Sequence, residues 1–378
     1  MRVAFVNENT LGHASYLRPL VRELERRPEL EIEPRWLDAT PLPSALERRA
    51  NFTIPGLRRW GLDGARARWR KVVSDHVRRQ LEALDAREPL AATVVNTQSV
   101  ALALTPLAAR LPLFVCLDAT FAQLARTPWF VPNAPSRWFA PWTLASLRRR
   151  ERRLVSAAAR LLPWSEAVGV SLRADYAVPP AKVSVLPPSL ELPPVRAGGR
   201  GPRARPQILF VGGDFTRKGG PLLCACFRRE FAGRAELHVV TQTPVPAEAG
   251  ICVHRRVAPG SAAWRERWAQ ADLFVFPSRL ETFGIVLVEA LAFGVPIVSA
   301  DVGAARELLL GGRAGWLLER LDAASLTTAI GEALDQPALA QAKALLGRRQ
   351  AEQQFDVRAN AERLAAWLAA ARVGFSGK

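Results

Sequence analysis

The chain has 378 residues, of which 49% are hydrophobic and 23% charged, with a formal net charge of +17. This length favours two domains, and this composition excludes an intrinsically disordered protein. No apolar run approaches the roughly 20 residues of a membrane-spanning helix, and the first residues, MRVAFVNENT, lack the regions of a signal peptide. We therefore expect a cytoplasmic protein, and the positive charge favours acidic partners such as phosphates, anionic lipid surfaces or nucleic acid.

The first half of the chain alternates short apolar runs with helical patterns. Apolar strands separated by helices indicate a parallel sheet covered on both faces. Helical patterns cover 15–26 and 65–84, and the expected strands are 2–7, 92–97, 113–118, 159–165 and 182–187.

The alternation starts again after residues 193–206, a stretch rich in Pro, Gly and Arg that we interpret as a linker. Two sets of βαβ units predict an α/β fold of two doubly wound, Rossmann-like domains. The first domain would cover 1–192 and the second 207–355, and a C-terminal helix at 356–378 could pack back on the first domain. In the second half we expect strands at 207–213, 236–241, 250–254, 272–278 and 296–301, and helices near 219–232, 262–270 and 283–293.

The loop FVGGDFTRKGG, residues 210–220, is a candidate phosphate site. In doubly wound sheets ligands bind beyond the carboxyl ends of the strands, and the N-terminus of the following helix offers free N–H groups. Lys218 would add a point charge that suits a phosphate. The alternative is a Gly-rich turn with solvated cations.

Two glutamates mark another strand end, in RLETFGIVLVEALAFGVP, residues 279–296. Glu281 falls in the loop after the strand, and Glu289 lies in an otherwise apolar helix that ends at Gly294. A carboxylate is kept in such a helix only if hydrogen-bond donors meet it, and sugar hydroxyls are donors of this kind. Alternatively, Glu289 pairs with a buried Arg or with backbone amides.

These motifs resemble those of a known family. PSRLETFGIVLVEALAFGVPIVSADVGAARELL, residues 277–309, closely resembles the signature of family-4 retaining glycosyltransferases of the GT-B fold, and Glu281 and Glu289 match its two glutamates. Residues 210–220 resemble the family's phosphate loop, and 165–192 resemble the segment before its interdomain linker. The resemblance implies two Rossmann-like domains that face each other across a cleft. It also implies an enzyme that moves a sugar from a nucleotide-diphosphate sugar to an acceptor hydroxyl.

The resemblance further implies roles for single residues. Lys218 would bind the donor diphosphate, Glu281 would hold hydroxyls of the transferred sugar, and Glu289 would hold the nucleotide ribose. The family usually has an Arg about where Gly213 stands, and Arg217 could substitute for it. No cofactor or metal is expected beyond the nucleotide-sugar co-substrate, and the donor-binding residues would be Gly12, Gly212, Gly213, Arg217, Lys218, Glu281, Thr282, Phe283, Gly284 and Glu289.

In enzymes of this family the first domain chooses the acceptor. Gly12 and His13 follow the first strand, and Asp118 follows another. His13 could contact phosphate or acceptor, and Asp118 could orient or deprotonate the acceptor hydroxyl, so both join Lys218 and Glu281 as candidate catalytic residues. Alternatively, His13 is a surface residue and Asp118 caps the next segment. The family implies retention of configuration, and we expect front-face attack because no second carboxylate is placed as a nucleophile.

Two segments mix aromatic residues with cations, residues 57–71 and 127–153. This composition is typical of interfacial membrane segments. It predicts an anionic membrane surface as partner, a sugar or lipid-linked acceptor, and peripheral attachment to the inner face of the cell membrane. The alternative is a pair of ordinary amphipathic helices with solvated arginines.

Other functions remain open from the sequence. A GT-B relative could act on the nucleotide sugar alone, as an epimerase or hydrolase, or the chain could be a non-catalytic basic binding protein. No nucleic-acid partner is expected, because the arginines are spread along both halves and no nucleic-acid module is recognised. The four cysteines, in apolar contexts, are expected to be buried thiols: Cys116, Cys224, Cys226 and Cys252.

Overall fold

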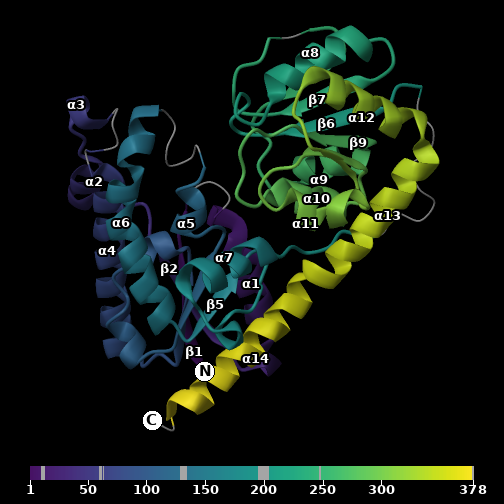
Figure 1. Ribbon diagram of the computed structural model, residues 1–378. Coiled ribbons are helices and arrows are strands. Elements are labelled where there is room, and N and C mark those ends of the chain that lie inside the picture. The colour runs from purple at the N-terminus through teal and green to yellow at the C-terminus, as the bar shows by residue number, and fades with distance from the viewer. Residues whose placement is uncertain are drawn as a thin grey trace. The chain divides into compact units, whose positions relative to one another are not determined.

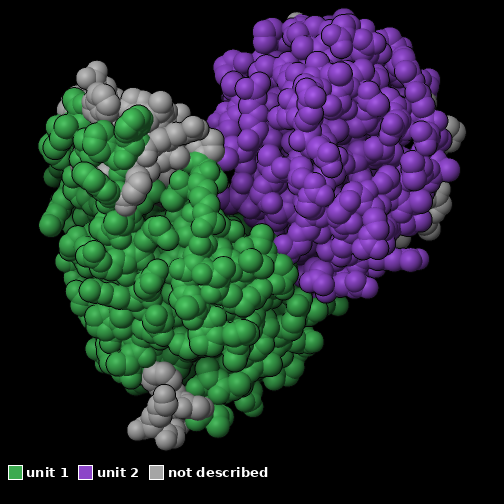
Figure 2. Space-filling view, viewed as in Figure 1, with its two compact units in different colours: residues 1–189, 357–378 green, residues 190–356 purple. Residues whose placement is uncertain are grey.

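The computed structural model describes residues 1–9, 13–58, 62, 64–127, 134–194, 204–246 and 248–376. The chain forms two compact units (Figures 1 and 2): residues 1–189 together with 357–378 form unit 1, and residues 190–356 form unit 2. Each unit is built around its own parallel sheet and its own apolar core. Residues 195–203 of the expected linker lie outside the described residues.

Unit 1 has a five-stranded parallel sheet in the order β2-β1-β3-β4-β5. Strands β3 and β4 are buried along their whole length, because Val, Leu and Phe cover both faces beneath the helices. The strands are β1 Arg2–Asn7, β2 Glu33–Asp38, β3 Ala92–Asn96, β4 Leu113–Leu117 and β5 Arg160–Pro163. The helices are α1 His13–Arg26, α2 Ser44–Asn51, α3 Pro55–Arg58, α4 Ala65–Arg87, α5 Phe121–Leu124, α6 Ala134–Ala157, α7 Glu166–Tyr176 and α14 Val357–Ser376, with 3-10 turns η1 Pro28–Leu30, η2 Gln98–Val100, η3 Leu107–Ala109 and η4 Pro180–Lys182.

Unit 2 has a six-stranded parallel sheet in the order β11-β10-β9-β6-β7-β8. The order reverses between β6 and β9, so the carboxyl ends of these neighbours form a switch point where ligands bind in such sheets. The strands are β6 Gln207–Val211, β7 Glu236–Val240, β8 Ile251–His254, β9 Leu273–Phe276, β10 Ile297–Ala300 and β11 Trp316–Leu318. The helices are α8 Gly220–Glu230, α9 Ala262–Gln270, α10 Ile285–Ala292, α11 Ala305–Leu308, α12 Ala323–Asp335 and α13 Pro337–Gln354, with the 3-10 turn η5 Leu310–Gly312.

The predicted strands are confirmed with one exception. Residues 182–187 form no strand: η4 occupies their start, and Val183 makes only an isolated bridge to Leu161. Two strands were not predicted. β2 is half exposed and carries polar residues, and β11 has only three residues. The expectation that all four cysteines are buried is wrong for Cys252, which is exposed on β8 at the edge of its sheet.

The last helix, α14, belongs to unit 1 and packs on α1. Arg27 Nη1 lies 2.8 Å from Glu362 Oε1, and Asn360 Nδ2 donates to Ser189 Oγ at 2.7 Å. The guanidinium of Arg160 lies over the ring of Trp367, 5.7 Å from its centroid. Within the described ranges, no helix is both long and apolar enough to cross a bilayer.

Candidate functional site

Two loops at one edge of the unit 2 sheet carry most of the expected donor-site residues. β6 and β9 are hydrogen-bonded neighbours, so the loops that follow them leave the sheet side by side. The first loop turns at Asp214, whose Oδ1 accepts the Arg217 amide at 3.1 Å. A Cβ on Gly219, where φ is +80°, would lie 1.9 Å from the carbonyl oxygen of Pro277. The loops therefore touch through their backbones, which only a glycine at this position permits.

Glu281 is held by three donors that all reach its Oε1. Lys218 Nζ forms an ion pair with it, Arg217 Nη1 donates at 2.9 Å, and Ser278 Oγ donates at 3.0 Å. Burial lowers the pKa of Lys218 below its usual value, although the charge of Glu281 acts in the opposite direction. In the described part of the chain, Oε2 of Glu281 has no hydrogen-bond partner. The cluster thus combines two cations with one carboxylate oxygen that has no partner among the described residues.

Glu289 of α10 is half-buried and receives one hydrogen bond. Trp264 Nε1 donates to its Oε1 at 2.9 Å. Burial raises the pKa of the Glu289 carboxyl to about 8, and the hydrogen bond from Trp264 acts in the lowering direction. The alternative of a buried Arg or backbone amides as partners is wrong for the described residues, since the donor is an indole. Oε2 has no hydrogen-bond partner among the described residues.

The remaining candidate residues of the donor site differ in backbone conformation, burial and the space around them. Gly284, with φ at +95°, is the N-cap of α10, and the Phe283 side chain is buried. Thr282 lies against Gly303, where a Cβ would come within 2.8 Å of its carbonyl oxygen. The Gly212 amide donates to the Val240 carbonyl, whereas the space beside the Gly213 Cα is open. Gly12 lies outside the described residues.

In unit 1 the structure brings His13 and Asp118 together. His13 Nε2 lies 3.4 Å from Asp118 Oδ2, and both side chains are largely buried, so the alternative of a surface histidine is wrong. Burial alone would lower the pKa of His13, but the charge and hydrogen bond of Asp118 outweigh it and raise this pKa. His13 is the first residue of α1, which follows β1, and Asp118 follows β4 of the same parallel sheet. Asn96 Nδ2 donates to the His13 carbonyl at 3.0 Å.

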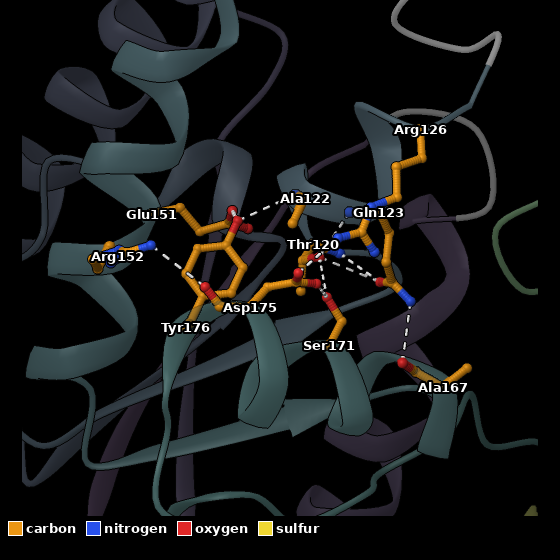
Figure 3. A network of polar contacts seen from close by, with 10 residues as sticks. All are labelled: Thr120, Ala122, Gln123, Arg126, Glu151, Arg152, Ala167, Ser171, Asp175 and Tyr176. Atoms are coloured by element: carbon orange, nitrogen blue, oxygen red, sulfur yellow. Dashed lines mark hydrogen bonds and ion pairs between the residues drawn. The ribbon is translucent and has the colours of Figure 1, made fainter. Parts of the chain in front are cut away.

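A buried polar network fixes the segment after Asp118 (Figure 3). Thr120 is the N-cap of α5 and forms a capping box with Gln123, so the alternative in which Asp118 is the cap is wrong. Glu151 of α6 is 0% exposed, accepts the Phe121 amide at 3.0 Å, and also accepts the Tyr176 hydroxyl. Burial raises the pKa of the Glu151 carboxyl to about 8.

Sequence patterns did not reveal three of these side chains. Ser278 stands three residues before Glu281, and a hydroxyl at the end of the strand was a signal that could have found it. Trp264 lies on another helix, α9, and Glu151 lies in an Arg-rich stretch that reads as a solvated face. Their partners are distant in the sequence, so no local spacing indicates these contacts.

The two segments that mix aromatic residues with cations are described only in part. Residues 59–61, 63 and 128–133 lie outside the described ranges. On α6, Trp138 and Trp142 are one helical turn apart and are 84% and 80% exposed. Phe52 and Leu57 of the same unit are also exposed. Exposed tryptophans on adjacent turns are unusual for a face that meets only water.

Comparison with known proteins gives a consistent result. Residues 205–336 match a family model described as glycosyl transferases group 1. The chain is similar to the GDP-mannose-dependent alpha-(1-6)-phosphatidylinositol monomannoside mannosyltransferase of Mycolicibacterium smegmatis, with 33% identity over 41% of this chain and 38% of that protein. It is also similar to D-inositol 3-phosphate glycosyltransferase 2 of Catenulispora acidiphila, with 29% identity over 50% of each chain. The chain thus spans half or less of the length of these two curated relatives.

Solved structures share the fold over nearly the whole chain. Sucrose-phosphate synthase from Thermosynechococcus elongatus superposes with a TM-score of 0.70 at 17% identity, covering 100% of both chains. Anabaena HepE in complex with UDP and glucose gives a TM-score of 0.65 at 16% identity, covering 98% of this chain and 100% of that one. The two doubly wound units therefore have the GT-B fold of glycosyltransferases.

Proposed function

We propose that this chain transfers a sugar from a nucleotide-diphosphate sugar to an acceptor hydroxyl with retention of configuration. The match of residues 205–336 to a family model described as glycosyl transferases group 1 supports this proposal. The observation that carries the proposal is the pair of glutamates in unit 2. Glu281 and Glu289 each have one oxygen held by protein donors and one oxygen without a hydrogen-bond partner among the described residues. A carboxylate oxygen without a protein partner suits a hydroxyl donor, and a sugar nucleotide has hydroxyls on both its sugar and its ribose.

On the donor side, Lys218 and Arg217 would neutralise the diphosphate without a metal ion. Both cations already lie against Glu281, so the diphosphate would bind beside an existing ion-pair cluster. Glu281 Oε2 would accept a hydroxyl of the transferred sugar, and Glu289 Oε2 a hydroxyl of the ribose. The protein would contribute mainly positioning and stabilisation of the leaving diphosphate.

In the transfer step, the acceptor oxygen would attack the anomeric carbon on the face that the diphosphate leaves. The new carbon–oxygen bond forms as the bond to the diphosphate oxygen breaks, and the acceptor proton passes to that leaving oxygen. In unit 1, His13 and Asp118 would contact the acceptor, and Asp118 would orient its hydroxyl. The raised pKa of His13 favours an imidazolium, which suits an acceptor that carries a phosphate.

A thermal-shift experiment tests the donor site. Wild type, Glu289→Ala and the control Glu332→Ala are heated with UDP, GDP, ADP and CMP in turn. Glu332 is a matched control because it also accepts an indole N–H, from Trp316 at 3.0 Å, elsewhere in unit 2. We expect one nucleotide to raise the melting temperature of wild type and Glu332→Ala but not of Glu289→Ala, because binding to the native state stabilises it. Equal shifts for all three proteins would refute the assignment of Glu289.

We propose, further, that unit 1 attaches to anionic membrane surfaces and that the acceptor is lipid-linked. Support comes from the exposed Trp138 and Trp142 on an Arg-bearing helix and from the net charge of +17. In flotation assays, wild type should bind vesicles that contain anionic lipid at low salt, and Trp138→Ser with Trp142→Ser should lose most of this binding. Val170→Ser, which changes a side chain of α7 that is 53% exposed, is the control. Wild type that remains unbound at low salt would refute peripheral attachment.

A further inference from the structure

Two interactions hold Trp264 in place for its contact with Glu289. Its backbone amide donates to Ser261 Oγ at 3.1 Å in the N-cap of α9. Its ring is 7% exposed and packs edge-on against Trp268, with centroids 6.1 Å apart. Its Nε1 donates to Glu289 Oε1 at 2.9 Å. An indole N–H can only donate, so the oxygen that it meets must act as an acceptor.

This contact determines how the Glu289 carboxyl faces a ligand. With Oε1 held by Trp264, Oε2 is the oxygen that has no hydrogen-bond partner among the described residues. The indole hydrogen bond also favours the ionised form, whereas burial favours the neutral form. The ionised form accepts a hydrogen bond from a hydroxyl more strongly than the neutral form does, because its oxygens share the negative charge.

No charged side chain of the described residues counteracts burial at Glu289. β10 carries no charged residue. On α13, Arg348 donates to the Ala292 carbonyl and pairs with Glu352, Lys343 donates to the carbonyls of Gly312 and Gly315, and Arg349 is exposed. α11 carries Glu307 and Arg306, which pairs with Asp301. On α9, Arg267 pairs with Glu266, and Arg265 donates to the Gly260 carbonyl.

We propose that Trp264 is a positioning residue of the donor site, whose indole N–H holds one oxygen of Glu289 so that the other oxygen accepts a hydroxyl of the nucleotide ribose. This inference rests on the proposed function and extends it to a residue outside the family signature. In this inference a residue of α9, Trp264, determines the orientation and the charge state of a carboxylate of α10, Glu289. Trp264 itself would not touch the reacting atoms.

The test compares Trp264→Phe with a matched control. Phe keeps an aromatic ring and removes only the N–H donor and part of the ring volume. Trp316→Phe removes the same type of bond, from Trp316 Nε1 to Glu332 Oε2, in the same unit. We expect Trp264→Phe to weaken the affinity for the nucleotide that binds wild type by roughly tenfold at pH 7, the effect of one charge-assisted hydrogen bond, and Trp316→Phe to leave it within twofold.

Two further readouts separate positioning from a general loss of structure. In the Glu289→Ala background, Trp264→Phe should cause no additional loss of affinity, because each change alone already removes the same Trp264–Glu289 hydrogen bond. Between pH 6 and 9.5 the ratio of wild-type to variant affinity should fall as pH rises. Without the indole hydrogen bond the pKa of Glu289 is higher. The variant is therefore ionised, and binds the nucleotide as wild type does, only at higher pH.

The outcomes distinguish this inference from the proposed function. If wild type binds no nucleotide, both are overturned. If wild type binds a nucleotide that Glu289→Ala binds more weakly, while Trp264→Phe keeps its affinity within twofold at every pH, the proposed function holds and the role of Trp264 is refuted. An equal loss caused by Trp264→Phe with and without the Glu289 carboxylate would also refute it.

Discussion

Glu151 in unit 1 and Glu289 in unit 2 are carboxyls whose pKa burial raises to about 8, yet their surroundings differ. Glu151 is 0% exposed, and its two oxygens accept the Phe121 amide and the Tyr176 hydroxyl. Glu289 has one donor on one oxygen, and its second oxygen has no hydrogen-bond partner among the described residues. A displaced pKa therefore does not by itself mark a ligand site. The oxygen without a protein partner distinguishes Glu289, the proposed ligand-binding carboxylate, from Glu151.

Removing the structural carboxylate should have the largest effect. Glu151→Ala leaves the Phe121 amide and the Tyr176 hydroxyl without their buried acceptor and creates a cavity between α5 and α6. We expect unit 1 to lose about 3 kcal/mol of its free energy of unfolding, measured by urea denaturation. Glu289→Ala is the comparison and should lose clearly less, because its carboxyl has one donor and contacts solvent. Equal losses would remove the distinction between the two carboxyls.

Lys218→Ala tests the proposed contact between unit 2 and the donor diphosphate. Loss of one charge-assisted contact to the diphosphate, of about 1.5–3 kcal/mol, should slow sugar transfer roughly tenfold to a hundredfold. The measurement is a single-turnover rate with saturating donor. Lys182→Ala is the control for charge, because Lys182 Nζ donates to the Ser156 carbonyl in unit 1. A normal rate in Lys218→Ala would mean that Arg217 alone neutralises the diphosphate.

The effect that is smallest per unit of the variable changed is a dependence of stability on pH. Glu151 has a folded pKa of about 8, above the usual value of 4.5. Between these values the native state holds a proton that the unfolded state has released, so this contribution to stability is complete below pH 4.5 and is lost as pH rises to 8. The loss is at most about 1.4 kcal/mol per pH unit. Urea denaturation at pH 5.5, 6.5 and 7.5 should show this slope in wild type and a reduced slope in Glu151→Gln. An unchanged slope in the variant would show that Glu151 is ionised in the fold.

The apolar strands and the two loops that carry Lys218, Glu281 and Glu289 were predictable because the sequence signal of each is local. Strands such as β3 and β4 are continuous apolar runs, and Lys218, Glu281 and Glu289 lie in two short stretches that flank neighbouring strands. β2 escaped prediction because an exposed edge strand needs no apolar pattern. Residues 182–187 have an alternating pattern, but they form only one bridge to β5. The roles of Trp264 and Glu151 were not predicted, because they depend on contacts with residues distant in the sequence rather than on local spacing.

During synthesis, unit 2 is complete before unit 1 is. Residues 357–376 form α14, which packs on α1 and contacts Ser189 through Asn360 and Arg160 through Trp367. A ribosome therefore releases every residue of unit 2 before it releases the helix that completes unit 1. Unit 1 must hold an uncovered face of α1 while residues 190–356 are made, which leaves that apolar surface open to chaperones. A nascent chain that stops before α14 would contain a complete unit 2 and an incomplete unit 1.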